Sequence, residues 1–151
     1  MKNVIQHTWF FEQTPETVWK YLTRSELMAQ WLMENDFKPL VGHQFMFRSK
    51  AYPPIGFDGN VFCEVLDLVP AKKLSYSWKF GPKPGEITVD SIVTWILISK
   101  DQGTELMLEH RGLTREIDLP AYNAMNEGWK KNIGVNMKKI MEESLSHETK
   151  H

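Results

Sequence analysis

The sequence has only one cysteine, Cys63, in 151 residues. A lone cysteine cannot form a disulfide within the chain, and it cannot supply the several thiolates of a structural zinc site. Basic residues are not concentrated either, because no run of lysine and arginine exceeds two residues and the formal net charge is -1. Nucleic-acid-binding proteins usually present a concentrated basic patch, so the sequence argues against a nucleic-acid partner.

Long apolar runs are also missing. Polar residues interrupt every apolar stretch, and residues 1–7 lack the apolar core of a secretory signal. We therefore expect no membrane-spanning segment and a reducing, cytoplasmic location. No cluster of His, Asp and Glu has the spacing of metal ligands, and Gly81 and Gly85 lack the Lys-Ser/Thr of a phosphate-binding loop. We expect no metal and no cofactor.

Aromatic residues, in contrast, are abundant at 12% of the chain, with six Trp and eight Phe. A chain of this length buries roughly 68–70% of its unfolded surface, which is enough for a core without disulfides or metals. We expect a single domain over residues 1–151 with a frayed polar end at 146–151. Aromatic side chains either fill such a core or line a small-molecule pocket, and both interpretations stay open for each residue.

The N-terminal part of the chain predicts one strand and two short helices. Residues 4–11 are rich in strand-forming residues, and every second side chain is expected to face inward. Thr14 and Pro15 predict the start of a helix, with a capping threonine and proline at the first helical position. Thr23, followed by Glu26 three residues later, predicts a capping box and a second helix from about residue 24 to 31.

From Val41 onward, apolar residues recur at every second position. This period of two predicts five strands, over 41–48, 60–69, 74–80, 87–99 and 105–111. Pro- and Gly-containing turns separate them. The inward-facing positions include Phe45, Phe47, Val61, Cys63, Val65, Leu74, Tyr76, Trp78, Phe80, Val89, Val93, Trp95, Leu97, Leu106, Leu108 and His110.

The remaining segment predicts a long amphipathic helix that begins at Asp118-Leu119-Pro120 and has roughly 25 residues. Its apolar positions are spaced by three or four: Tyr122, Met125, Trp129, Ile133, Met137 and Ile140. A six-stranded antiparallel sheet has one face to cover, and only this helix is long enough to cover it. We therefore predict an α+β, helix-grip fold, in which a curved six-stranded antiparallel sheet wraps around the C-terminal helix and two short helices lie between the first and second strands.

Five segments carry a resemblance to a known family: residues 11–19 (FEQTPETVW), Trp31, 74–78 (LSYSW), 103–106 (GTEL) and 127–129 (EGW). Together they resemble the START-like, helix-grip superfamily that includes the birch pollen allergen and polyketide cyclases. Within it, the sequence is most similar to homologues of the activator of the 90-kDa heat-shock protein ATPase. The resemblance implies the fold. It also implies a cavity beneath the helix, where related members bind sterols, lipids, hormones or polyketides.

The candidate ligand site consists of inward-facing side chains between the sheet and the long helix. The expected lining is Trp9, Phe45, Phe47, Tyr76, Trp78, Trp95, Leu108, His110, Met125 and Trp129. Such a cavity binds a flat apolar ligand through burial, at about 25 cal/mol per Å², and Tyr76 and the indole N–H groups orient it. The alternative is a solid core in which His110 is satisfied by a backbone carbonyl. A nucleophilic pair of Cys63 and His110 is a further, weaker alternative.

A second candidate is the apolar loop around Pro53-Pro54, because loops normally face water. Tyr52, Ile55 and Phe57 either gate the cavity, contact a partner or fold back onto the core. Three functions follow from these features. We favour binding of a small apolar, aromatic or lipid-like molecule by a monomer or weak dimer. The alternatives are a chaperone-interacting module and a cyclase- or hydrolase-like enzyme that uses His110 and Tyr76 as acid or base.

Overall fold

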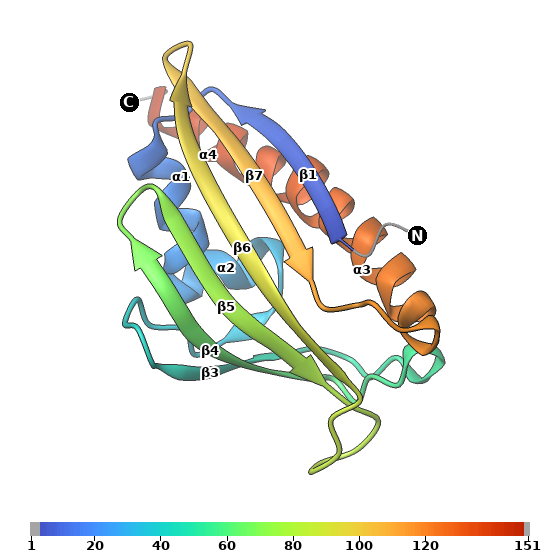
Figure 1. Cartoon of the computed structure of the whole chain (residues 1–151). Coiled ribbons are helices and arrows are strands. Elements are labelled where there is room, and N and C mark those ends of the chain that lie inside the picture. Colours follow the sequence, from blue (N-terminus) through green and yellow to red (C-terminus); the bar gives the residue numbers. More distant parts are fainter. Residues whose placement is uncertain (1–3, 150–151) are drawn as a thin grey trace.

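The computed structural model describes residues 4–149, with the side chains of 145–149 excepted. Its centre is a curled antiparallel sheet of seven strands in the order β1-β7-β6-β5-β4-β3-β2 (Figure 1). The strands are β1 Val4–Phe11, β2 Glu34–Asn35, β3 Gln44–Arg48, β4 Asn60–Val69, β5 Lys73–Phe80, β6 Val89–Lys100 and β7 Gly103–Arg111. The predicted α+β, helix-grip class is confirmed, with seven strands in place of six.

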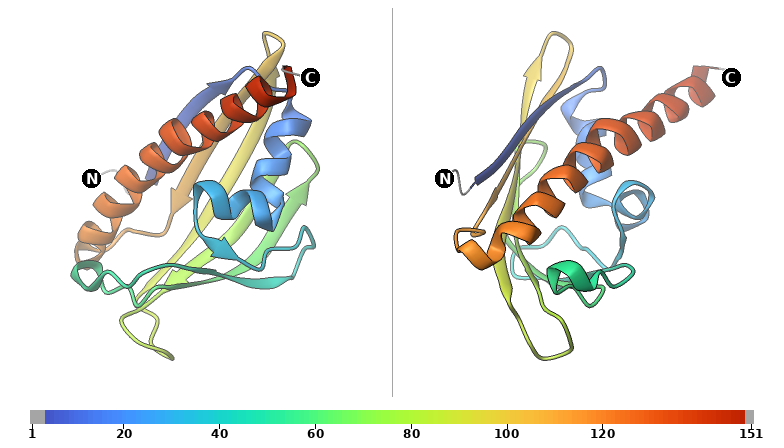
Figure 2. Two further views of the ribbon diagram at one scale, coloured as in Figure 1. Left: turned by 180° about the vertical axis from the view of Figure 1, so that it is seen from behind. Right: turned by 90° about the vertical axis from the view of Figure 1, so that its right-hand side faces the viewer.

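All helices lie on one face of this sheet (Figure 2). The two short helices are α1 Pro15–Thr23 and α2 Ser25–Trp31. The long C-terminal helix consists of α3 Leu119–Lys131, a π-helical segment Asn132–Met137 and α4 Lys138–Thr149, and it crosses the sheet diagonally. Its face toward the strands, together with the inner face of the sheet, encloses the core. No described helix is long and apolar enough to span a membrane.

The predicted inward and outward alternation of the strands is confirmed. In β5, Leu74, Tyr76, Trp78 and Phe80 are all buried. Leu106, Leu108 and His110 of β7 are buried in the same way, and so are Trp129, Ile133 and Met137 of the helix. The helix therefore covers the inner face of the sheet because the two apolar surfaces, with periods of 2 and 3.6 residues, face each other.

Two predictions about the segment before β3 were wrong. The expected capping box does not form, because the Thr23 hydroxyl donates to the backbone carbonyl of Trp19 at 2.7 Å, and α2 begins at Ser25 without a side-chain cap. The short strand β2 was missed. It has two residues, paired with Phe47 and Arg48, and two residues are too few to show an alternating pattern.

The π-helical segment was not predicted either. It lies at the centre of the long helix and packs against α2. Gly134 lies within it, and a Cβ atom at this position would be 3.2 Å from Nε1 of Trp9 on β1. The backbone of α4 is helical to Thr149, and residues 150 and 151 of the expected frayed end at 146–151 lie outside the described residues.

Candidate functional site

Four buried tryptophans from different elements meet beneath the long helix: Trp31 of α2, Trp78 of β5, Trp95 of β6 and Trp129 of α3. The ring centroid of Trp129 is 5.2 Å from that of Trp78 and 5.5 Å from that of Trp95. Trp31 meets Trp95 edge-to-face at 6.0 Å. This tryptophan cluster lies between the sheet and the long helix, where the sequence predicts a ligand cavity.

His110 lies beside the tryptophan cluster, and both of its ring nitrogens have partners. The hydroxyl of Ser91 donates to the backbone carbonyl of Trp78 at 2.8 Å, so its oxygen accepts from Nε2–H of His110, also at 2.8 Å. Nδ1 then has a lone pair, and it accepts the indole N–H of Trp129 at 3.0 Å. Burial lowers the pKa of His110 to about 3, which keeps the ring neutral at physiological pH.

Tyr76 and Cys63 are buried in the same core. The Tyr76 hydroxyl accepts the indole N–H of Trp95 at 3.0 Å. Burial raises the pKa of Tyr76, and it also raises the pKa of the Cys63 thiol, so both side chains keep their protons. Cys63 lies on β4, and two further strands separate it from His110 on β7. The Cys63–His110 pair suggested as a weaker alternative does not form.

The indole of Trp78 differs from those of the other three cluster members. Trp31 donates to the carbonyl of Tyr21 at 2.8 Å, and Trp95 and Trp129 donate to Tyr76 and His110. Nε1 of Trp78 has no hydrogen-bond partner, and it is the only buried side-chain nitrogen or oxygen atom within the described part of the chain for which this holds. A buried donor without a partner costs about 1–3 kcal/mol, so Trp78 is an unusual feature of this core.

Trp78 also lines a small apolar pocket at the edge of the tryptophan cluster. The pocket has a volume of about 60 Å³ and lies between α3 and the segment that joins α2 to β2. Its lining is Leu32, Met33, Trp78, Met125, Gly128, Trp129 and Asn132. The two tryptophans are buried and form its floor, whereas the other five are partly exposed and form its mouth.

The structure separates the ten expected lining residues into three groups. Trp78, Met125 and Trp129 line the pocket. Six others are buried in the core outside this pocket: Phe45, which also lines a larger hollow, Phe47, Tyr76, Trp95, Leu108 and His110. Trp9 is half-buried and lies near Gly134, away from the pocket. Leu32, Met33, Gly128 and Asn132 were not predicted as lining residues. Of these, only Gly128, a glycine within a predicted helix, could have indicated the pocket from sequence.

At the apolar loop, Tyr52, Pro53 and Pro54 are exposed. Ile55 and Phe57 are partly buried and pack against the core, and the ring of Phe57 lies 5.2 Å from that of Phe80. Tyr52 is 53% exposed. The loop contains a 3₁₀ turn, Pro53–Ile55, which contacts α3 near the start of the long helix.

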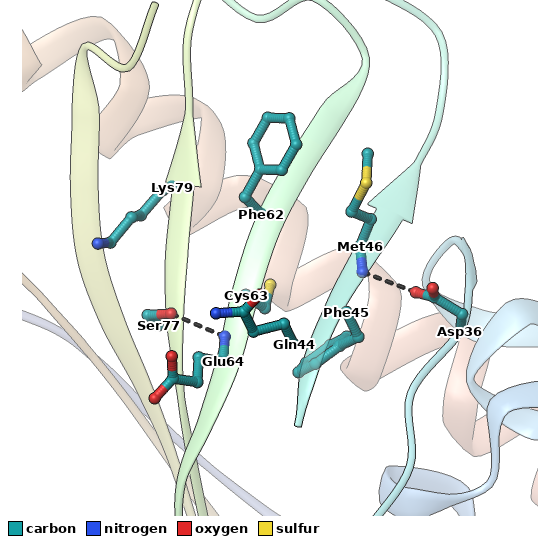
Figure 3. A pocket seen from close by; sticks show the side chains of 9 residues that line it. All are labelled: Asp36, Gln44, Phe45, Met46, Phe62, Cys63, Glu64, Ser77 and Lys79. Atoms are coloured by element: carbon teal, nitrogen blue, oxygen red, sulfur yellow. Dashed lines mark hydrogen bonds between the residues drawn. The ribbon is translucent and has the colours of Figure 1, made fainter. Parts of the chain in front are cut away.

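A larger hollow, of about 400 Å³, is lined by Asp36 and by side chains of β3, β4 and β5 (Figure 3). On one side of it, the Ser77 hydroxyl accepts the backbone N–H of Glu64 at 2.8 Å. On its other side, the carboxylate of Asp36 accepts the backbone N–H of Met46 at 2.7 Å. These polar groups complete the hydrogen bonding of the strands, and the hollow has mixed polar and apolar walls. Among the side chains that the structure describes, those of residues 4–144, no group of three or more His, Cys, Asp or Glu is arranged to hold a metal ion.

The chain is similar in sequence and in structure to known proteins. A stretch of 75 residues is 36% identical to mouse activator of 90 kDa heat shock protein ATPase homolog 1, and it covers 49% of this chain and 20% of the mouse protein. The chain thus spans only a minor part of that relative. A crystal structure of a Mesorhizobium loti protein is 31% identical over 93% of this chain and 97% of the other, with a TM-score of 0.81.

A crystal structure of a Plasmodium falciparum HSP90 activator shares the fold. Its TM-score is 0.71 at 20% identity, over 93% of this chain and 96% of the other. Residues 12–142 match the sequence profile of the family described as activator of Hsp90 ATPase homolog 1-like protein. This match covers all elements from α1 to the first turn of α4. The chain therefore has a START-like fold and belongs to the family of activator of Hsp90 ATPase homolog 1-like proteins.

Proposed function

We propose that the protein binds a small, predominantly apolar molecule in the pocket beneath α3. The observation that carries the proposal is the unpartnered N–H of Trp78, a residue that forms part of the floor of this pocket. Natural cores rarely leave a donor without a partner, and a ligand with an acceptor atom would remove that cost. The rest of the lining is apolar apart from Asn132, as in typical small-molecule sites.

The pocket must enlarge to hold a ligand, because typical ligand sites have about 300–1,000 Å³. Its walls have the properties that this change requires. Met33 and Met125 have flexible side chains that repack readily. The π-helical segment begins at Asn132, and π-helical turns occur frequently at functional sites. We infer that α3 moves outward from the sheet when the ligand enters.

Titration of the protein with libraries of flavonoids, polyketide-like aromatics and fatty acids tests this proposal. Binding is followed through the six indole N–H signals in ¹H–¹⁵N NMR spectra. A Cβ atom at Gly128 meets no atom within 4 Å, so G128L has room to fill the mouth of the pocket. The control, K130L, adds a leucine at an exposed position of the same helix. We expect binding to be lost in G128L and kept in K130L. Absence of any ligand that shifts the Trp78 or Trp129 signals contradicts the proposal.

A second candidate function is interaction with a 90-kDa chaperone, supported by the family and by the outer face of the sheet. Ile92, Ile96 and Ile98 of β6 and Met107 of β7 are 36–45% exposed on this face. Ile96 and Met107 are directly paired across the two strands. Contiguous exposed apolar side chains are typical of protein-binding surfaces. Of the three loop residues predicted to gate the cavity or contact a partner, Tyr52, Ile55 and Phe57, only Tyr52 is exposed.

Co-purification with the 90-kDa chaperone and measurement of its ATPase rate test this second function. We expect I96D to abolish both effects, because it places a charge at the centre of the apolar face, and G128L to leave them intact. If the wild-type protein neither binds the chaperone nor changes its ATPase rate, the second function is excluded. A separate enzymatic role receives no support from His110 and Tyr76, because His110 Nδ1 and Nε2 and the Tyr76 hydroxyl are engaged within the core.

A further inference from the structure

The pocket beneath α3 contains no ionisable side chain. His110 is a titratable residue in contact with the pocket floor, and its ring centroid is 5.8 and 6.1 Å from those of Trp78 and Trp129. Its Nδ1 already accepts from Trp129, and its Nε2 already donates to Ser91. The imidazole is therefore neutral and offers neither charge nor a spare hydrogen-bonding group to an occupant of the pocket.

Asn132 is the one polar side chain of the lining other than the indoles. It is partly exposed at the mouth, and its Oδ1 accepts from the side-chain amide of Asn136 at 3.3 Å. On the floor, the indole N–H of Trp129 is used by His110. The N–H of Trp78, the other residue of the floor, is fully buried and has no partner within the described part of the chain, so a ligand reaches it only once the pocket has enlarged.

From this distribution of groups we infer which ligands the pocket selects: the end of the molecule that reaches the floor is uncharged and carries one hydrogen-bond acceptor, such as a ketone or ester carbonyl, which bonds to Trp78 Nε1. This inference rests on the proposed function and specifies which class of ligand the pocket accepts. An acceptor supplies the partner that the indole lacks. A carboxylate in the same place would be a buried charge without a counter-charge, which is strongly unfavourable. A hydrocarbon end would leave the donor unpaired.

Three probes of similar shape separate these contributions. Acetophenone has a carbonyl beside a phenyl ring, α-methylstyrene replaces the carbonyl oxygen by a CH₂ group, and benzoate carries a charge. Dissociation constants are measured by NMR titration of the full chain, and the Trp78 indole signal is assigned from its absence in W78F. We expect acetophenone to bind roughly two- to tenfold more tightly than α-methylstyrene, the net contribution of one hydrogen bond. The affinity for benzoate should be lower than that for acetophenone by a factor of about ten or more.

The Trp78 indole proton gives a second readout. Acetophenone should move its resonance downfield, as hydrogen bonding does, whereas α-methylstyrene should not. In W78F the preference for acetophenone should disappear. In the control W95F it should persist, because the N–H of Trp95 bonds to Tyr76 outside the pocket. The comparison of the three probes on the wild-type protein needs no variant, so it holds even if W78F folds poorly.

The outcomes distinguish this inference from the function on which it rests. Equal affinities for acetophenone and α-methylstyrene would show binding without use of the Trp78 donor and would overturn the inference alone. Benzoate as the tightest of the three would do the same, since it would require a charged partner in the pocket. If none of the three probes perturbs Trp78 or Trp129, while the broader libraries bind there, the inference is again wrong. If nothing binds there at all, the proposed function fails with it.

Discussion

Trp129 of α3 donates its indole N–H to Nδ1 of His110 on β7 at 3.0 Å, and this bond joins the long helix to the inner face of the sheet. Both side chains are buried. The bond also fixes the imidazole, because a neutral ring that accepts at Nδ1 must carry its proton on Nε2, where Ser91 accepts it. The packing of the helix and the charge state of the histidine are therefore linked.

The first prediction concerns Trp129 itself. Replacement by alanine removes a large buried ring from between Trp78 and Trp95 and leaves Nδ1 of His110 without a partner. We expect W129A to lower the free energy of unfolding by about 3–5 kcal/mol. W129F retains a ring and should lose less, about 1–3 kcal/mol. Urea unfolding followed by circular dichroism measures both changes.

A matched control for W129A is F10A. Phe10 lies on the outer face of β1 and is 41% exposed, so its replacement should cost less than about 1 kcal/mol. A cost below about 1 kcal/mol for W129A would mean that the ring does not lie between helix and sheet in solution. That result would contradict the architecture as well as the prediction.

The second prediction is a pH dependence that arises from His110. Burial lowers its pKa to about 3 in the folded protein, whereas an unfolded histidine has a pKa of about 6.5. Between these values the unfolded state binds one proton more than the folded state, so stability decreases as the pH falls. The integrated loss between pH 7 and pH 3 is roughly 3–5 kcal/mol.

Carboxylates also titrate in this range, and a comparison with H110Q isolates the histidine. Glutamine retains a donor and an acceptor but does not ionise, so the decline in stability from pH 6.5 to pH 4.5 should be shallower in H110Q than in the wild type. Urea unfolding at half-unit pH intervals measures the two slopes. Parallel slopes would show that His110 is not held neutral by the fold.

Most of the fold was predictable because it follows from local periodicity. Alternation in 74–80 identified Tyr76 and Trp78 as inward-facing, and the spacing of Trp129, Ile133 and Met137 identified the buried face of the helix. The π-helical segment was not predictable in this way. The spacing of four residues between Ile133 and Met137 is compatible with an α-helix and with a π-helix. The apolar pattern therefore does not distinguish the two.

The candidate site was less predictable than the fold. Periodicity shows which side chains face inward, but not whether they fill the space between sheet and helix, which depends on their volumes and on the helix position. Six of the expected lining residues are buried but do not line the pocket beneath α3. The pocket mouth is formed partly by Leu32 and Met33, in a connection without periodic pattern. In the solid-core alternative, His110 was expected to bond to a backbone carbonyl. Its partners are instead the side chains of Ser91 and Trp129.

The third prediction concerns the start of the long helix. The guanidinium of Arg115 donates to both oxygens of Asp118, at 2.7 and 3.0 Å, and also to the backbone carbonyl of Thr88 before β6. The backbone N–H of Arg115 donates to the same carboxylate. These hydrogen bonds from Arg115 hold the pKa of Asp118 below its usual value. The contacts fix the direction in which the chain enters α3.

We expect D118N to lower the free energy of unfolding by about 1–3 kcal/mol at pH 7, because a buried, charge-assisted bond is lost. The lowered pKa means that this stabilisation is present above the ordinary aspartate pKa and is lost as the pH falls through the folded value. The difference between D118N and the wild type should therefore shrink in acid. E116Q, at an exposed position two residues earlier, should remain within about 0.5 kcal/mol of the wild type.

The fourth prediction uses two glycines of the long helix. Glycine within a helix costs roughly 0.5–1 kcal/mol relative to alanine, because it has more conformational freedom to lose on folding. At Gly128 an added Cβ meets no atom within 4 Å. At Gly134 the same atom would lie 3.2 Å from Nε1 of Trp9, closer than an ordinary contact. The two positions are therefore chemically alike but differ in the space available.

We expect G128A to raise the free energy of unfolding by about 0.5–1 kcal/mol, the full difference in propensity. G134A should show no gain or a loss, because the indole of Trp9 must shift to admit the methyl group. The double substitution G134A with W9A removes that obstacle, and the alanine should then stabilise relative to W9A alone. Thermal and urea unfolding of the four variants measure these differences. Equal gains for G128A and G134A would mean that β1 and the π-helical segment are further apart than the structure has them.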